Sequence, residues 1–265
     1  LPGDGEPRFL INPFGMMFDE VTASNLIVVD MQGKVVEGEA PANSAGFTIH
    51  SAVHMAREDA HCVIHTHTLP GMAVAACEDG LLQLNQISTE FYQRVGYHPY
   101  EGVAFDLDER ARIQRSLGNN IAMILQSHGL LSVGRTVADA FYIMYYLNRA
   151  CEIQMAAAQL AALSPIHTIA PHLSQHACEQ LMGVEHERQQ VWQAWLRRLD
   201  RLDTSYKDSR LCLISLSLWI VTTRISPAIS APPCSSFPTS PRSCPITRRR
   251  AARSTPAAGS LARSC

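Results

Sequence analysis

The sequence lacks the features that would place it in a membrane or in an oxidising compartment. It has no run of about 18 or more apolar residues, so we expect no membrane span. The opening residues, LPGDGEPRF, have neither a basic start nor an apolar stretch and predict no signal peptide. None of the eight cysteines forms a CxxC pair. We interpret them as reduced thiols of a cytoplasmic protein.

Positive charge is scarce over most of the chain. The chain has 22 basic and 24 acidic residues. Residues 1–207 contain 14 of the basic and 23 of the acidic ones, a net charge of about −9. Residues 208–265 carry eight arginines and one acidic residue, a net charge of about +7. The acidic body argues against nucleic acid as a partner, because phosphate contacts need Lys and Arg. The last 58 residues also contain 12 serines and seven prolines. We therefore expect one folded domain over 1–207 and a disordered tail over 208–265.

Strand and helix patterns alternate along the body. RFLI and SNLIVVDMQGKVVEG predict strands, the latter with a turn at Gln32–Gly33. Helical patterns are PANSAGFTIHSAVHMARED, LDERARIQRSLG and the long segment from Thr136 to Leu163. AHCVIHTHT and NIAMILQSHGLLSVG each predict one buried strand, and QLNQISTEFY and GVAFDLD look strand-like. The alternation favours an α/β fold with helices covering a central sheet.

Three histidines suggest a metal site. His65 and His67 are two residues apart on a predicted strand, so their side chains share a face. Such pairs also occur on ordinary strands, but His128 lies at the end of another apolar segment. Together the three offer a set of nitrogen ligands with an open position, as catalytic zinc requires. His50 and His54, four apart on a predicted helix, could share a metal, but we expect them to pack or to hydrogen-bond around the site.

Four motifs resemble the class II aldolase and adducin family. They are FLINPFGMMFDEVTASNLIVVD, NSAGFTIHSAVHMAREDAHCVIHTHT, ILQSHGLLSVG and ADAFYIMYYLNRACEIQ. The resemblance implies a three-layer α/β/α domain around a central, mostly antiparallel sheet, assembled as a homotetramer. It implies that His65, His67 and His128 hold Zn²⁺ or another divalent ion. It also implies an aldolase or epimerase that acts on a small, sugar-like hydroxy-carbonyl compound through an enediolate.

The chain departs from this family at two places. The Ser-Ser-Glu of the family enzymes, whose Glu is the acid/base, falls on Ser44, Ala45 and Gly46, so no carboxylate stands there. The phosphate loop retains only Gly15, and its upstream strand would precede Leu1. The resemblance therefore implies Gly15, Asn43 and Ser44 as substrate-binding residues, for a substrate that need not be phosphorylated.

The missing carboxylate leaves the acid/base open. Glu152, which resembles a family glutamate on the long helix, and Tyr97 are our candidates. Further candidates are Glu90, Tyr92, Glu101 and the late Tyr206, which by resemblance reaches a neighbouring subunit.

NSAGFTIHSA is closer to adducin than to the aldolases, which leaves a second hypothesis: a non-catalytic module that binds a cytoskeletal protein such as actin. A third is a degraded gene product without activity, suggested by the abrupt start and the change of composition near residue 208.

Overall fold

The structure is a computed structural model that describes residue 1 and residues 6–208. The predicted tail lies outside the described residues from residue 209 onward, as do four of the eight cysteines. Within the described part, no helix is both long and apolar enough to cross a membrane.

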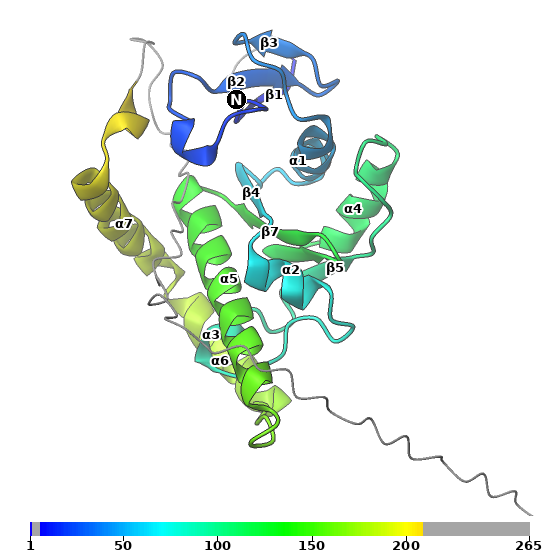
Figure 1. Cartoon of the computed structure of the whole chain (residues 1–265), viewed down its shortest axis with the longest axis vertical. Coiled ribbons are helices and arrows are strands. Elements are labelled where there is room, and N and C mark those ends of the chain that lie inside the picture. Colours follow the sequence, from blue (N-terminus) through cyan, green and yellow to red (C-terminus); the bar gives the residue numbers. More distant parts are fainter. Residues whose placement is uncertain (2–5, 209–265) are drawn as a thin grey trace, which may run out of the picture. The chain divides into compact units, whose positions relative to one another are not determined.

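The central sheet has four strands in the order β4-β7-β6-β5 (Figure 1). Their bounds are β4 Cys62–Thr66, β5 Val95–His98, β6 Ala122–Leu125 and β7 Gly129–Gly134. β7 pairs antiparallel with both β4 and β6, and only β5 and β6 run parallel. The sheet is mostly antiparallel, as predicted.

A second, smaller sheet precedes it. β1 (Arg8–Ile11), β2 (Ile27–Asp30) and β3 (Val35–Glu37) pair antiparallel in that order. The predicted turn between the last two strands is confirmed: Gly33 has φ +89°, which a residue without Cβ adopts at no steric cost.

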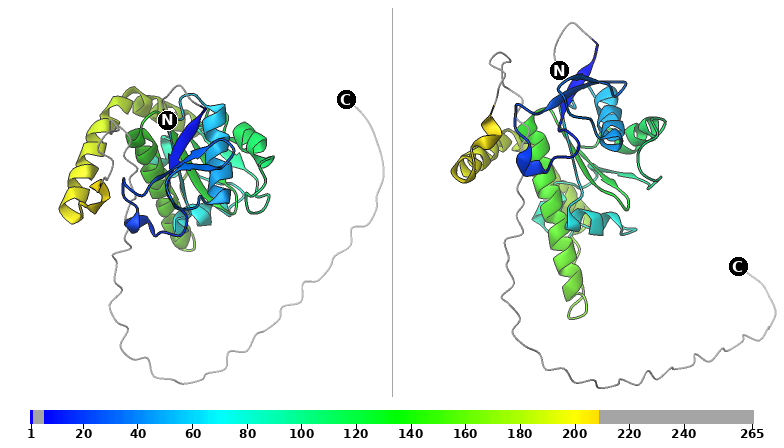
Figure 2. Two further views of the ribbon diagram at one scale, coloured as in Figure 1. Left: turned by 90° about the horizontal axis from the view of Figure 1, so that it is seen from above. Right: turned by 45° about the horizontal axis from the view of Figure 1, so that its top comes forward.

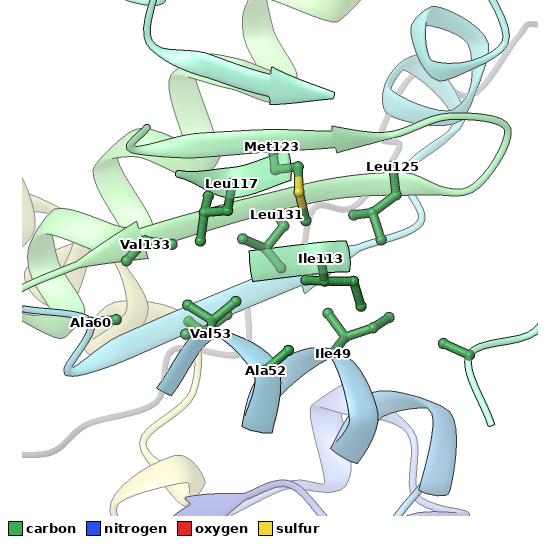
Figure 3. Packing of buried hydrophobic residues seen from close by; sticks show 12 residues of the cluster. Ile49, Ala52, Val53, Ala60, Ile113, Leu117, Met123, Leu125, Leu131 and Val133 are labelled. Atoms are coloured by element: carbon green, nitrogen blue, oxygen red, sulfur yellow. The ribbon is translucent and has the colours of Figure 1, made fainter. Parts of the chain in front are cut away.

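Helices cover both faces of the central sheet. α1 (Ser44–Ala56) and α4 (Glu109–Leu117) pack on one face, where Ile49, Val53 and Ile113 meet alternate residues of the strands (Figure 3). α2 (Leu69–Ala75), α3 (Gln86–Thr89) and α5 (Val137–Leu160) pack on the other. Because strand side chains alternate, β6 and β7 supply both cores. The predicted α/β/α arrangement is confirmed.

Two further helices pack on the outer side of this domain. α6 is Pro171–Gly183 and α7 is Arg188–Leu202 (Figure 2). α7 packs Trp192 against Phe141 of α5, with ring centroids 5.5 Å apart. Short 3₁₀ turns complete the described elements: η1 Phe18–Glu20, η2 Glu185–Glu187 and η3 Ser205–Lys207.

Three strand predictions were wrong. In QLNQISTEFY, Asn85 caps α3 by accepting bonds from Ile87 N and Ser88 N, so the segment turns instead of extending. GVAFDLD is a loop, and the fourth strand is Val95–His98 instead. NIAMILQSHGLLSVG is a hairpin of two strands, because Ser127, with φ +54°, helps reverse the chain.

Candidate metal centre

His65 and His67 lie where β4 ends and α2 is about to begin. His65 shares a strand face with Val63, which packs against α1, whereas Thr66 points to the other face and bonds Met144. Thr68 stops the strand by capping α2, because its side-chain oxygen accepts from Gly71 N. The pair is thus fixed at a strand end, next to a helix start.

His128 reaches the same place from the β6–β7 hairpin. β7 pairs with β4, with Leu130 opposite Thr66, which brings the hairpin turn beside His67. Gly129 permits this approach: a Cβ there would lie 2.4 Å from the Thr66 carbonyl oxygen. A side chain at this position would push the hairpin away from β4.

The three rings form one cluster. Their centroids are 4.7 Å (His65–His67), 4.8 Å (His65–His128) and 4.6 Å (His67–His128) apart. One ligand nitrogen from each lies within 4.8 Å of the others, and the Nε2 atoms of His65 and His67 are 2.8 Å apart. Two nitrogens bound to one tetrahedral zinc lie about 3.3 Å apart, so the cluster has the dimensions of a single-ion site.

The protonation of the rings also suits a metal. The Nδ1–H of His65 donates to the Leu130 carbonyl at 2.9 Å, which leaves its Nε2 lone pair facing the other two rings. Burial lowers the pKa of His65 to about 3, with the charges of His128 and His67 adding to the effect. Burial also lowers the pKa of His67 and His128. Neutral imidazoles are the form that binds metal, and these residues therefore fit a divalent ion.

Two other histidines act electrostatically on the cluster. His98, at the end of β5, lowers the pKa of His128, and His50, on α1, lowers that of His65. His98 is 2% exposed and engaged at both nitrogens, with Ser116 Oγ at 3.0 Å and Glu109 Oε1 at 3.2 Å. His50 is half-buried. Among the described residues, it makes no hydrogen bond.

The predicted substrate-binding residues lie at two chain turns. Asn43 and Ser44 begin α1, where Asn43 Oδ1 accepts from Gly46 N at 3.1 Å. Gly15 has φ +86° in an open turn. Their role in binding substrate remains a prediction.

Each predicted acid/base residue has a hydrogen-bond partner that is not one of the three clustered histidines. Glu152 accepts from Asn148 Nδ2 at 2.8 Å and from Arg149. The Tyr97 hydroxyl accepts from Leu81 N at 3.2 Å. The remaining candidates are paired as follows: Glu90 with Arg188 at 2.9 Å, Glu101 with Arg112 at 2.6 Å, Tyr206 with Asp200 at 2.6 Å, and Tyr92 with Gln93 at 3.5 Å.

One supporting contact was not foreseen from the sequence. Thr68, next to His67, donates to Asn148 Oδ1 of α5 at 2.5 Å, and Asn148 is 5% exposed. The chain Thr68–Asn148–Glu152 thereby ties the end of β4 to α5. Asn148 lies among the buried residues of α5, and a buried side-chain amide is the signal that points to such a bond.

Comparison with known proteins gives consistent matches. Residues 3–155 match the family described as class II aldolase and adducin N-terminal domain. A Pseudomonas aeruginosa protein, whose name places it provisionally among the class 2 aldolases, is 44% identical over 209 residues, covering 77% of this chain and 80% of that protein.

Two solved structures are similar as well. The aldolase II superfamily protein from Pseudomonas syringae is 42% identical, with a TM-score of 0.72 over 78% of this chain and 83% of that chain. The L-fuculose 1-phosphate aldolase from Glaciozyma antarctica PI12 is 27% identical, with a TM-score of 0.65 over 77% of this chain and 80% of that chain.

Proposed function

Because this chain belongs to the class II aldolase and adducin family, as its motifs predicted, we propose that it is a divalent-metal-dependent lyase or epimerase. Its substrate is a small hydroxy-carbonyl compound of the sugar type. The observation that carries the proposal is the convergence of three neutral imidazoles, His65, His67 and His128, on one point. Zinc is the ion we expect, because nitrogen ligands suit it.

A bound divalent ion supplies positive charge that polarises a carbonyl oxygen and stabilises negative charge developing there. The residues of the chain prepare its site. The Leu130 carbonyl holds the His65 ring in the tautomer that offers Nε2, and Gly129 lets the two strands approach. Three protein ligands leave a position for substrate oxygens. Asn43 and Ser44, at the start of α1, are the polar groups proposed to contact the substrate.

Metal content tests the proposal directly. Purified protein is expected to contain about one divalent ion per chain by inductively coupled plasma mass spectrometry. His65→Ala and His128→Ala should lose it, while the exposed His61→Ala, from the same segment, serves as the matched control and should retain it. Protein without stoichiometric zinc, manganese or cobalt would refute the proposal.

The second candidate is a non-catalytic adducin-like module that binds a cytoskeletal protein. It is favoured by the donor set: among the described residues, the cluster contains three histidines and no carboxylate. Co-sedimentation with actin filaments tests it. Chelator-sensitive aldol cleavage or epimerisation would count against it.

We also propose a homo-oligomer, a tetramer by family membership, in the cytoplasm. Two segments expose large apolar side chains that a subunit interface would cover. They contain Phe14, Met17 and Phe18, and Tyr100, Val103 and Phe105. The four described cysteines are free, which suits a reducing compartment. Light scattering coupled to gel filtration measures the molar mass and hence the number of subunits. A monomer at micromolar concentration would refute the proposed oligomer.

A further inference from the structure

His67 is the exposed member of the triad, and its ring has no anchor of its own. The ring of His65 is fixed by its bond to the Leu130 carbonyl, and the turn that carries His128 is closed by His128 N, which donates to the Leu125 carbonyl at 3.0 Å. Among the described residues, the His67 ring bonds only to Nε2 of His65. That bond joins two atoms that would hold the ion, so it is lost once the site is filled. The backbone must therefore hold His67 in place.

The backbone at His67 is a short link between two elements. β4 ends at Thr66 and α2 begins at Leu69, so only His67 and Thr68 join them. The Thr68 hydroxyl oxygen accepts from Gly71 N at 3.2 Å, and a Cβ at Gly71 would lie 2.8 Å from this oxygen. Because Thr68 directly follows His67, a group that holds this hydroxyl in place also holds the backbone of the ligand.

Asn148 of α5 is that group. The Thr68 hydroxyl donates to Asn148 Oδ1 at 2.5 Å. Only 5% of Asn148 is exposed, and a hydrogen bond shielded from water is stronger than one that solvent can replace. The bond therefore fixes the distance between the His67 link and the long helix.

Glu152 determines which end of the Asn148 amide faces Thr68. An asparagine side chain can present either its oxygen or its nitrogen to a neighbour. Asn148 Nδ2 donates to Glu152 Oε1 at 2.8 Å, one helical turn further along α5, so Oδ1 is the atom left for Thr68. Arg149 donates to the other carboxylate oxygen of Glu152 at 2.5 Å. The series of bonds from Arg149 to Thr68 thus has one consistent arrangement of donors and acceptors.

We propose that Asn148 is a positioning residue for His67. Acting through Thr68, it holds the ligand nitrogen of this exposed histidine at the triad, and Glu152 fixes the amide that does so. The assignment rests on the metal binding of the proposed function. It gives Glu152 an influence on metal affinity, which a residue that only transferred a proton would not have.

Zinc affinity and the visible spectrum of the Co²⁺-loaded protein test the assignment without a substrate. Asn148→Ala and Thr68→Val should bind zinc about tenfold more weakly than the wild type, measured by competition with a chelating dye. Thr68→Ser keeps the hydroxyl and should bind zinc like the wild type. The Co²⁺ spectra of the first two variants should differ from that of the wild type, because the geometry of one ligand changes.

Thr66→Val is the matched control. Thr66 flanks His67 on the other side and also reaches α5, but it donates to the Met144 sulfur at 3.3 Å, a weak acceptor. This variant should keep the wild-type zinc affinity. Glu152→Ala should weaken zinc binding as Asn148→Ala does, whereas Glu152→Gln, whose amide oxygen can still accept from Asn148, should keep it.

The outcomes separate this assignment from the function on which it rests. Wild-type affinity and Co²⁺ spectrum in Asn148→Ala or in Glu152→Ala would overturn it. An equal loss of affinity in Thr66→Val would also overturn it, because any loosening around His67 would then have the same effect. If Asn148→Ala does not fold, the comparison of Thr68→Val with Thr68→Ser decides in its place. Wild-type protein that itself binds no zinc overturns the proposed function, and the assignment with it.

Discussion

Acid should destabilise the metal-free protein because its buried histidines must take up protons. The lowered pKa of His50 gives the expected loss of folding free energy. Its pKa falls from 6.5 in the unfolded chain to about 3 in the folded one. A depressed pKa contributes stability above the unfolded value, and that stability is lost as pH falls from 6.5 toward 3. At pH 5, about 1.5 units below the unfolded pKa, this histidine is almost fully protonated in the unfolded chain and still neutral in the folded one, which costs about 2 kcal/mol of folding free energy.

Urea unfolding in the presence of a chelator measures this. With a slope of about 2 kcal/mol per molar urea, the midpoint should fall by about 1 M per such histidine between pH 7 and pH 5. His65, whose pKa is also lowered to about 3, contributes a similar loss. The variant His50→Gln removes one of the two terms, so its free energy of unfolding should fall about 2 kcal/mol less than that of the wild type. Equal pH slopes for the two proteins would refute the reasoning.

Three further predictions follow from the packing around the site. Gly129→Ala should weaken zinc binding at least about tenfold, measured by competition with a chelating dye, because its Cβ would meet a backbone carbonyl of β4; unchanged affinity would show that the hairpin can shift freely. Asn148→Ala leaves the Thr68 hydroxyl without its partner and should cost about 1–3 kcal/mol in thermal unfolding. Arg188→Met leaves Glu90, 3% exposed, without its cation and should cost about 3–5 kcal/mol. Adding Glu90→Gln should recover much of that loss, and a double variant no more stable than the single one would contradict the ion-pair account.

Local pattern accounts for much of the fold. Helical patterns in the sequence predicted the helices now seen at Ser44–Ala56 and Val137–Leu160. In both, a polar residue caps the first turn, Asn43 and Thr136. The β2–β3 turn at Gly33 followed from sequence for the same kind of reason. Such features depend on neighbouring residues only, so they can be read without knowledge of the rest of the chain.

The wrong strand predictions concern segments whose structure depends on contacts with distant parts of the chain. Val103, Phe105 and Leu107 alternate like a strand, yet all three are exposed in a loop. The edge position beside β6 is taken by Val95–His98, whose Gly96 lies so close to Ser116 that a Cβ would be 2.1 Å from its carbonyl oxygen. Pairing partners and close approaches of this kind are set by the fold as a whole.

The sequence by itself determined which donors are available: two histidines on one strand face, a third before a glycine, and no carboxylate at Ala45 or Gly46. Strand alternation and the chemistry of imidazole are local properties. The tertiary structure decided how these groups are used. Pairing of β7 with β4 closes the triad, and packing engages both ring nitrogens of His98. A hydrogen bond between distant elements depends on their positions in space, which only the folded chain specifies.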